Sequence, residues 1–194
     1  VIYYVTDEVQ QSQYINMFKE AGLNAVILRH NIDTAFITHV ERQREDLKFQ
    51  RIDADITDTF KEETGEEELK ETTDTLTEVF RKALDKENLQ VKVEKLKNES
   101  VSSMMVLSEE SRRMQDMMKM YGMDSAMYGG QETLVLNASN KLVSYILEHK
   151  DGEHVPMICR QLYDLAMLAH KPLNPDEMTK FIARINEIML MLAK

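Results

Sequence analysis

The C-terminal segment constrains the fold more than any other part of this sequence. Asn174, Pro175 and Glu177 combine a helix N-cap, a proline at the first helical position and an acid that can close a capping box. The predicted helix carries an apolar seam at alternating steps of three and four residues, made of Met178, Phe181, Ile185, Ile188 and Leu192. A second apolar row, Ile182 and Met189, lies beside the seam.

The preceding segment predicts a helix that pairs with this seam. Its apolar residues recur at steps of four, three and four, with Tyr163 and Ala166 widening the stripe formed by Ile158, Leu162, Leu165 and Ala169. One hairpin partner is too narrow to cover the apolar circumference of the last helix. The excess surface predicts contact with another chain or another domain.

Composition limits the class of protein. The 194 residues are 43% hydrophobic and 30% charged with six glycines, which suits two compact, helix-rich parts. The formal net charge of -10 argues against a nucleic-acid surface. The single cysteine, Cys159, excludes an internal disulfide and a structural zinc site and favours a reducing compartment. No apolar run approaches the ~20 residues that span a bilayer. The chain opens without a signal peptide or an initiating Met, as expected for a piece of a longer protein.

Residues 1–57 alternate between strand and helix patterns. Apolar runs at 1–5, 25–28 and 47–52 predict strands, and the second run lacks polar alternation, as in a strand buried on both faces of a parallel sheet. The turn after the first strand, Thr6-Asp7-Glu8, lacks the glycines of a phosphate-binding loop. We therefore expect a scaffold sheet rather than a nucleotide site. Helical stripes lie between the strands, one of Tyr14, Met17, Phe18 and Ala21 ended by Gly22, the other of Phe36, Ile37 and Val40.

An acidic, poorly patterned stretch at 58–72 predicts a linker, with a domain boundary near residue 57. Beyond it, apolar spacing predicts a helix over 76–83, and alternation predicts a half-buried strand over 89–93. Further strands are expected at 104–107 and 133–136. The second part is therefore predicted to be α+β.

Eight of the fourteen methionines lie between residues 104 and 130. If Ser108 caps a helix, then Met114, Met117, Met118 and Tyr121 share one face, flanked by Met120. The opposite face carries Arg112, Gln115, Asp116 and Lys119. Such a methionine stripe is either core packing or a surface that adapts to dissimilar partners, because methionine is unbranched and polarizable.

Catalytic and metal-binding patterns are weak. Cys159 follows His154 by five residues, and helical positions at that spacing do not face each other. The histidines at 30, 39, 149, 154 and 170 show no ligand spacing, so we predict no metal site. Paired carboxylates are expected on solvated faces of a chain with 34 acids, and they indicate no acid–base pair.

Three segments together resemble the heat-shock protein 90 family of chaperones: VIYYVTDEVQQSQYINMFKEAGLNAVIL, SEESRRMQDMMKMYG, and NASNKLVSYIL with ICRQLYDLAMLAHKPLNPDEMTKFIARINEIMLMLAK. The resemblance follows the order of the elements over nearly the whole chain. It implies an α+β fold, with the end of the family's middle domain at 1–57 and a dimerisation and client-contact domain at 58–194. In that family the final helical hairpin forms a four-helix bundle across the dimer.

The resemblance also implies cofactors and partners. ATP and magnesium would bind an N-terminal domain upstream of Val1, so the fragment itself would hold no cofactor and would not be an enzyme. The chain ends in LMLAK, without the acidic tail of cytosolic eukaryotic members. That ending implies a bacterial form and no tetratricopeptide co-chaperones. The reducing compartment that the single cysteine favours gives an expected cytoplasmic location. Two alternatives stay open: a structural dimerisation module of an unrelated protein, and a small α/β enzyme.

The resemblance assigns roles to two sets of residues. The partners it implies are a second copy of the chain and unfolded or partly folded client proteins, with no nucleic acid and no membrane. The expected dimer interface comprises Leu162, Leu165, Phe181, Ile182, Ile185, Ile188, Met189 and Leu192. The expected client-contact residues are Met114, Met117, Met118, Met120, Tyr121, Met123 and Met127.

Overall fold

The computed structural model describes residues 1–30, 32–54, 60–61, 66–123 and 132–193. The chain forms two compact units, Val1–Phe60 with Val106–Glu132, and Lys61–Met105 with Thr133–Lys194. The first break lies near the predicted boundary at residue 57, and a segment from the middle of the sequence joins the first unit. The assignment of the two parts to a middle domain and a dimerisation domain stays a prediction.

A three-stranded parallel sheet lies at the centre of the first unit, with β1 (Ile2–Val5) between β2 (Val26–Ile27) and β3 (Phe49–Arg51). Tyr4 of β1 is in register with Val26 on one side and Arg51 on the other. Because β2 is an edge strand, Val26 and Ile27 are 44% and 49% exposed. The prediction that 25–28 is buried on both faces is therefore wrong, and the central strand is β1.

Of the two predicted helical stripes in the first unit, the first is buried as expected and the second only in part. α1 (Ser12–Glu20) buries Tyr14, Met17 and Phe18, and the ring of Phe18 meets that of Tyr3 edge-on at 4.9 Å between centroids. Its end at Gly22 is confirmed, since that residue has φ +67°. α2 (Asp33–Gln43) buries Ile37 but leaves the neighbouring Phe36 exposed, because successive residues of a helix point about 100° apart.

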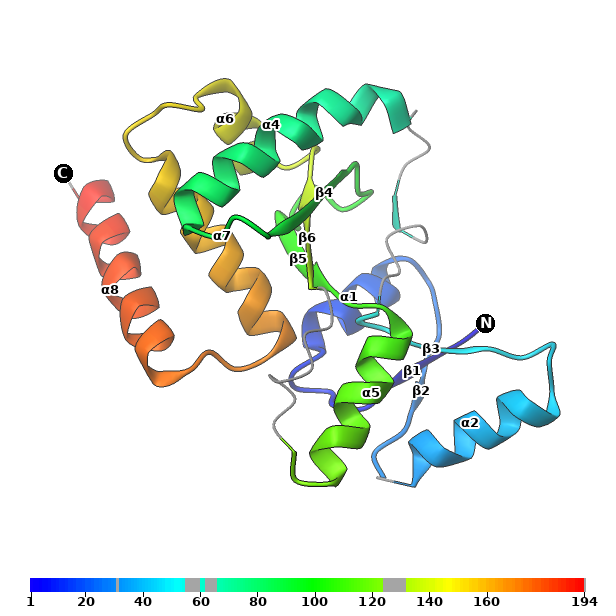
Figure 1. Cartoon of the computed structure of the whole chain (residues 1–194). Helices are drawn as coiled ribbons and strands as arrows, with labels where there is room; N and C mark the ends of the chain where they lie inside the picture. Colours follow the sequence, from blue (N-terminus) through cyan, green and yellow to red (C-terminus); the bar gives the residue numbers. More distant parts are fainter. Residues whose placement is uncertain (31, 55–59, 62–65, 124–131, 194) are drawn as a thin grey trace. The chain divides into compact units, whose positions relative to one another are not determined.

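The second unit is built on the sheet β4 (Gln90–Glu94), β6 (Thr133–Asn137) and β5 (Ser103–Val106), in that order, with β4 and β6 parallel. α4 (Glu66–Leu84) packs against β4, α6 (Lys141–Glu148) and α7 (Val155–His170) (Figure 1). The helices bury their apolar faces against the sheet. The resulting core includes Leu76, Phe80, Val93, Met105, Leu134, Leu136, Val143, Ile146, Cys159, Leu162 and Phe181.

The predicted linker at 58–72 is partly helical. α4 begins at Glu66, so the last part of the acidic stretch belongs to a helix, and Leu69 is buried in the core. Composition alone favours a linker here, but acidic residues are also favourable in the first turn of a helix, where they interact with the helix dipole. Residues 55–59 and 62–65 lie outside the described part of the chain.

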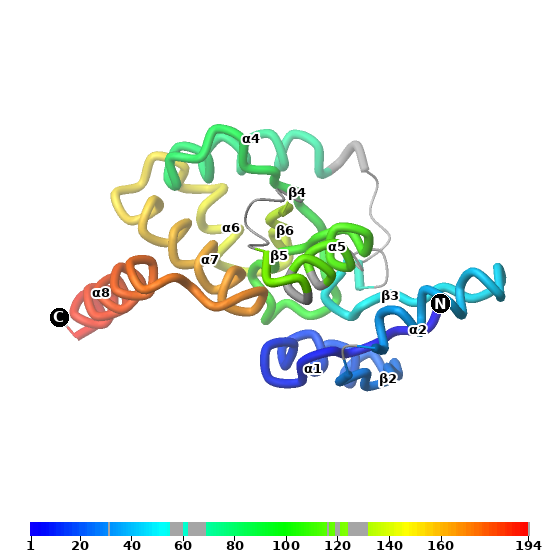
Figure 2. The backbone as a smooth tube through the Cα atoms, turned by 60° about the horizontal axis from the view of Figure 1, so that its bottom comes forward, coloured from blue at the N-terminus to red at the C-terminus, as the bar shows by residue number. Residues whose placement is uncertain are grey.

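α8 (Pro175–Leu192) forms a hairpin with α7 and packs against it. Within the second unit, Figure 2 shows α8 running along the outside, with α7 as the element beside it. The mixture of helices and small sheets confirms the predicted α+β class. A four-helix bundle across a dimer stays a prediction.

Candidate functional site

The α7–α8 hairpin is fixed at its turn and along one side. Asn174 Oδ1 accepts a hydrogen bond from the Glu177 backbone N–H at 2.9 Å, and the Asn174 N–H donates to Glu177 Oε2 at 3.1 Å, so the capping box is confirmed. Further along α8, Arg184 Nε donates to Gln161 Oε1 at 2.9 Å, and the same guanidinium pairs with Asp164. These contacts fix which face of α8 lies against α7.

The residues expected at the dimer interface differ in burial. Leu162 and Phe181 are buried in the core of their own unit. Ile185 and Ile188 are half-buried, and Ile185 packs against that core. The other residues are exposed, by 44% for Leu165, 52% for Ile182, 52% for Met189 and 83% for Leu192. We call these exposed residues the hairpin edge.

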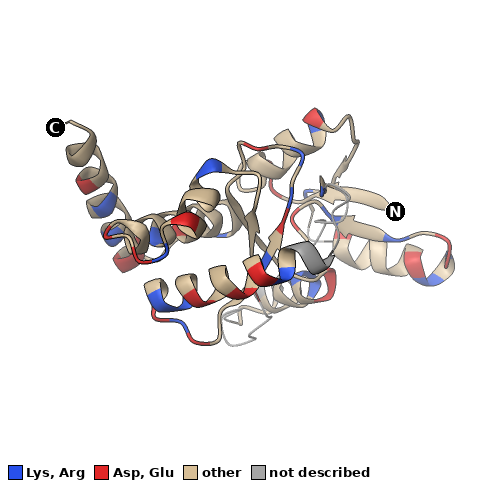
Figure 3. Ribbon diagram, turned by 90° about the horizontal axis from the view of Figure 1, so that it is seen from above, with Lys and Arg blue, Asp and Glu red and all other residues tan. Residues whose placement is uncertain are grey.

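The hairpin edge exists because α7 covers only part of the apolar surface of α8. At 100° per residue, the apolar positions from Ile188 round to Ile182 span roughly 120° of the helix. Phe181, on one side of that arc, is buried, whereas Ile182 and Met189, on the other side, are half exposed. Charged side chains are sparse toward the C-terminal end of α8 (Figure 3). The hairpin edge is therefore the part of the expected interface that a second chain could reach.

α5 (Glu109–Met120) is the helix that carries the methionine stripe, and it belongs to the first unit. Its predicted N-cap is confirmed, because the Ser111 N–H donates to Ser108 Oγ at 3.2 Å. At its C-terminus, Gly122 has φ +69°, and the Met123 N–H donates to the Met118 carbonyl at 3.0 Å. Both ends of the helix are thus satisfied by local hydrogen bonds.

The methionine face of α5, defined as Met114, Met117, Met118 and Tyr121, is not packed into a core. Met117 is 45% exposed and Tyr121 is 73% exposed, while Met114 and Met118 are half-buried. Beyond the helix, Met123 is 52% exposed. The side chain of Met120 and all of Met127 lie outside the described residues.

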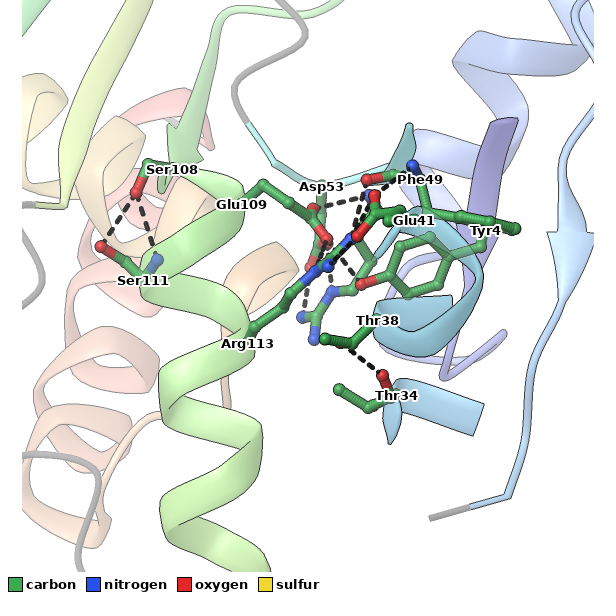
Figure 4. A network of polar contacts seen from close by, with 11 residues as sticks. Tyr4, Thr34, Thr38, Glu41, Phe49, Asp53, Ser108, Glu109, Ser111 and Arg113 are labelled. Carbon is green, nitrogen blue, oxygen red and sulfur yellow. Dashed lines mark hydrogen bonds and ion pairs between the residues drawn. The ribbon is translucent and has the colours of Figure 1, made fainter. Parts of the chain in front are cut away.

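α5 instead contacts the rest of the first unit through charged side chains of its first two turns (Figure 4). Glu109 accepts hydrogen bonds from the Tyr4 hydroxyl at 2.7 Å, the Arg51 backbone N–H at 2.8 Å and Arg113 Nε at 2.8 Å. Arg113 reaches further and donates to Glu41 of α2 at 2.6 Å. The first two turns of α5 are therefore connected to β1, β3 and α2.

A buried triad lies beside these contacts. Asp53 accepts two hydrogen bonds from Arg51, at 2.6 and 2.9 Å, in the bidentate geometry that favours guanidinium–carboxylate pairs. Arg112 of α5 donates to the Asp53 carbonyl at 3.3 Å and lies 3.5 Å from its carboxylate. The side chains of Asp53 and Arg112 are 2% and 4% exposed. We call Glu41, Arg51, Asp53, Glu109, Arg112 and Arg113 the ion cluster.

The ion cluster shifts the pKa of several groups. Burial alone would raise the pKa of Asp53, but the hydrogen bonds and charge of Arg51, with the charge of Arg112, lower it to about 2. Burial likewise opposes ionisation of Glu41, yet the hydrogen bond from Arg113 holds its pKa below the ordinary value. Burial, followed by the charge and hydrogen bond of Glu109, raises the pKa of Tyr4. Both carboxylates are therefore ionised at neutral pH, and Tyr4 keeps its proton.

The turn after β1 satisfies its own N–H groups. Gln11 Oε1 accepts from the backbone N–H of Thr6 at 2.8 Å and of Asp7 at 3.0 Å. The Asp7 carboxylate accepts from the N–H of Val9 and Gln10. A phosphate-binding loop would direct such groups at its ligand instead. This geometry supports the expectation of a scaffold sheet.

The described residues lack two other features. They contain no group of three or more His, Cys, Asp or Glu side chains that could hold a metal ion. None of the described helices combines the length and the apolar character needed to cross a membrane.

The sequence matches the protein family described as Hsp90 protein over residues 1–193. The chain belongs to the Hsp90 family. Among curated relatives, the chaperone protein HtpG of Bacteroides thetaiotaomicron is 28% identical over 167 residues, which cover 80% of this chain and 24% of that protein. The resemblance to the family that the sequence segments carry is thus confirmed.

Other bacterial relatives have the same name and match a similar share of this chain. The chaperone protein htpG of Bacteroides fragilis is 28% identical over 162 residues, covering 77% of this chain and 23% of the relative. The chaperone protein HtpG of Porphyromonas gingivalis is 29% identical over 158 residues, covering 76% and 23%. This Hsp90 chain therefore resembles the bacterial HtpG proteins and spans about a quarter of the length of these relatives.

Sequence reasoning missed the ion cluster of this Hsp90 chain. A local signal existed, because Glu109 and Arg113 are four residues apart on one helix, a spacing at which opposite charges pair. The further partner of Arg113 is Glu41, 72 positions away, and no local pattern shows that contact. The charged residues opposite the methionines were predicted as one face of an amphipathic helix, and Arg112 of that face is in fact buried.

Proposed function

We propose that this chain dimerises an ATP-dependent parent chaperone and contacts unfolded or partly folded client proteins. Membership of the Hsp90 family supports the chaperone class. The observation that carries the proposal is the hairpin edge, where α8 exposes Ile182, Met189 and Leu192 although α7 lies beside it. The methionine face of α5, which is part of the first unit, would supply the client-contact surface.

The physical argument for dimerisation is the burial of the hairpin edge. Fully burying an Ile, Leu or Met side chain gains about 1.5–3 kcal/mol, and the hairpin-edge residues each have about half or more of that gain still available. In a two-fold dimer the same surface is used on both protomers, so each contribution counts twice. Leu162 and Phe181, buried beneath the surface, would support the proposed four-helix bundle from within each protomer.

A pair of charged substitutions tests this interface. I182E/M189E places two carboxylates on the hairpin edge and is expected to give monomers in sedimentation velocity, because burying unpaired charges is strongly unfavourable. The control A183E/L190E adds the same two charges at the next residue of α8 in each case. Both of these positions are exposed, and the control is expected to remain dimeric. A dimeric I182E/M189E chain would place the interface elsewhere.

The methionine face of α5 supports client contact by a separate argument. Its exposed residues, Met117 and Tyr121, lie outside the core, so a packing role does not account for them. Methionine side chains repack around dissimilar apolar surfaces, which suits a site that takes many clients. Met123 extends the same exposed apolar character past the end of the helix.

The substitution M117S/Y121S tests client contact. We expect this variant to lose most of its suppression of client aggregation, while its melting temperature and dimer mass stay those of the wild-type chain. The control is L142S/Y145S on α6, which removes a Leu and a Tyr that are 47% and 38% exposed. Equal suppression by both variants would exclude the methionine face as the client site.

The remaining parts of the proposal concern the parent protein. ATP and magnesium would bind outside this chain, and the chain itself would neither bind nor hydrolyse ATP; its engaged β1–α1 turn supports this. We propose a cytoplasmic location and no nucleic-acid partner. The alternatives of an unrelated structural module or a small α/β enzyme are not favoured, because the family match extends over residues 1–193.

A further inference from the structure

α5 packs against the rest of the first unit with charged side chains, and it leaves apolar side chains exposed, the reverse of an ordinary amphipathic helix. Such a helix normally buries its apolar stripe and leaves its charged face in water. Here Arg112 is buried, and Glu109 and Arg113 make ion pairs and hydrogen bonds beneath the helix, while Met117 and Tyr121 stay exposed. Hydrophobicity alone would favour the opposite orientation.

The ion pairs and hydrogen bonds of the ion cluster oppose this hydrophobic preference for the opposite orientation. Removing one partner from a buried ion pair is strongly destabilising, whereas the intact pair is often no more stable than well-packed apolar residues. Buried pairs therefore favour one arrangement over others more than they raise total stability. Turning α5 so that its methionines face the sheet would separate Arg112 from Asp53 and leave the Asp53 carbonyl without that donor.

Glu109 and Arg113 would both lose hydrogen bonds to other elements in such a rotation. The Glu109 carboxylate accepts from the Tyr4 hydroxyl of β1 and the Arg51 backbone N–H of β3, whereas its bond from Arg113 lies within α5 and turns with the helix. Arg113 adds hydrogen bonds to Glu41 and to the Phe49 carbonyl at 2.9 Å. Hydrogen bonds to charged groups stabilise a fold more than those between neutral groups do, so these contacts favour the observed orientation.

We propose that the ion cluster sets the orientation of α5, with Glu109 as one of the positioning residues that keep the methionine face directed outward. The orientation itself follows from the contacts within the first unit. Its link to client binding rests on the proposed function, and the two are tested by separate readouts.

A cysteine at position 117 reports the orientation. In the M117C chain the introduced thiol replaces a side chain that is 45% exposed, and the native Cys159 is fully buried, so the labelling rate with a thiol reagent measures access to the methionine face. E109Q is compared with E110Q in this background. Both remove one carboxylate charge from the first turn of α5, but Glu110 is exposed.

We expect E109Q to slow labelling by about tenfold, because loss of the hydrogen bonds of the Glu109 carboxylate lowers the outward-facing fraction of chains to about a tenth. E110Q is expected to leave the rate unchanged. An unchanged rate in E109Q would overturn the proposal, because the cluster would then stabilise α5 without orienting it. A faster rate would overturn it as well, because α5 would then detach rather than turn.

Client binding is read in the same variants without the added cysteine. Slower labelling together with weaker suppression of client aggregation supports both the orientation and the proposed function. Slower labelling with full suppression supports the orientation alone and contradicts client contact at the methionine face. If E109Q fails to fold, R112M replaces it under the same criteria, because Asp53 then keeps its bidentate partner Arg51.

Discussion

At the scale of single residues, Asp53 couples the stability of the chain to pH. Its pKa is about 2 in the folded chain against an ordinary value of 3.8, so the stabilisation is complete above the ordinary value and is lost as the pH falls toward 2. The difference corresponds to about 2 kcal/mol in the free energy of unfolding. Glu41, whose pKa is also lowered, acts in the same direction.

The corresponding prediction compares wild type with D53N in urea unfolding between pH 6 and pH 2.5. The wild-type free energy of unfolding should fall more steeply with acid than that of D53N, with a difference approaching about 2 kcal/mol. D53N should also be less stable at pH 6, because Arg51 and Arg112 lose a buried partner. Parallel pH profiles would show that Asp53 does not carry this dependence.

Cys159 supplies a second prediction at the residue scale. Burial raises the pKa of its thiol to about 12, and its side chain lies in the core of the second unit. We expect no reaction with a thiol reagent at pH 8 in native buffer and complete reaction once urea unfolds the chain. Rapid labelling of the native wild-type chain would contradict the buried position of Cys159.

At the scale of elements, the capping box of α8 is expected to stabilise the folded chain by a measurable amount. N174A removes the acceptor for the Glu177 N–H and is expected to lower the free energy of unfolding by about 1 kcal/mol. N186A, at an exposed position within the same helix, is the control and should not lower it, since alanine is the better helix former. A similar loss in both variants would mean that the cap does not stabilise α8.

Helix ends that are marked by a local sequence pattern were predicted well from the sequence. The end of α1 at Gly22 and the start of α8 at Pro175 depend on neighbouring residues, and both are confirmed. The exposure of β2 was missed, because it depends on which strand is central in the sheet, a matter of long-range pairing between Tyr4 and its two neighbours. α6, with Asn140 as its N-cap, was not predicted from its pattern at all.

At the scale of the whole molecule, the sequence predicted the apolar surfaces of α8 and α5 better than it predicted the contacts that hold these helices. Both surfaces could be read from spacing, and residues of each, among them Ile182, Met117 and Tyr121, are exposed in the structure. The division of the expected interface residues into buried and exposed sets required the position of α7. The ion cluster required contacts between α5 and residues such as Glu41 and Asp53, far away in sequence.

The mass of the 194-residue chain in solution tests the central claim most directly. Sedimentation velocity over a range of concentrations is expected to show a species of twice the 22.6 kDa of one chain, with the share of dimer rising with concentration. An interface with a Kd of about 10 μM would be largely dimeric at about 100 μM. A single 22.6 kDa species at every concentration up to that value would contradict dimerisation through the hairpin edge.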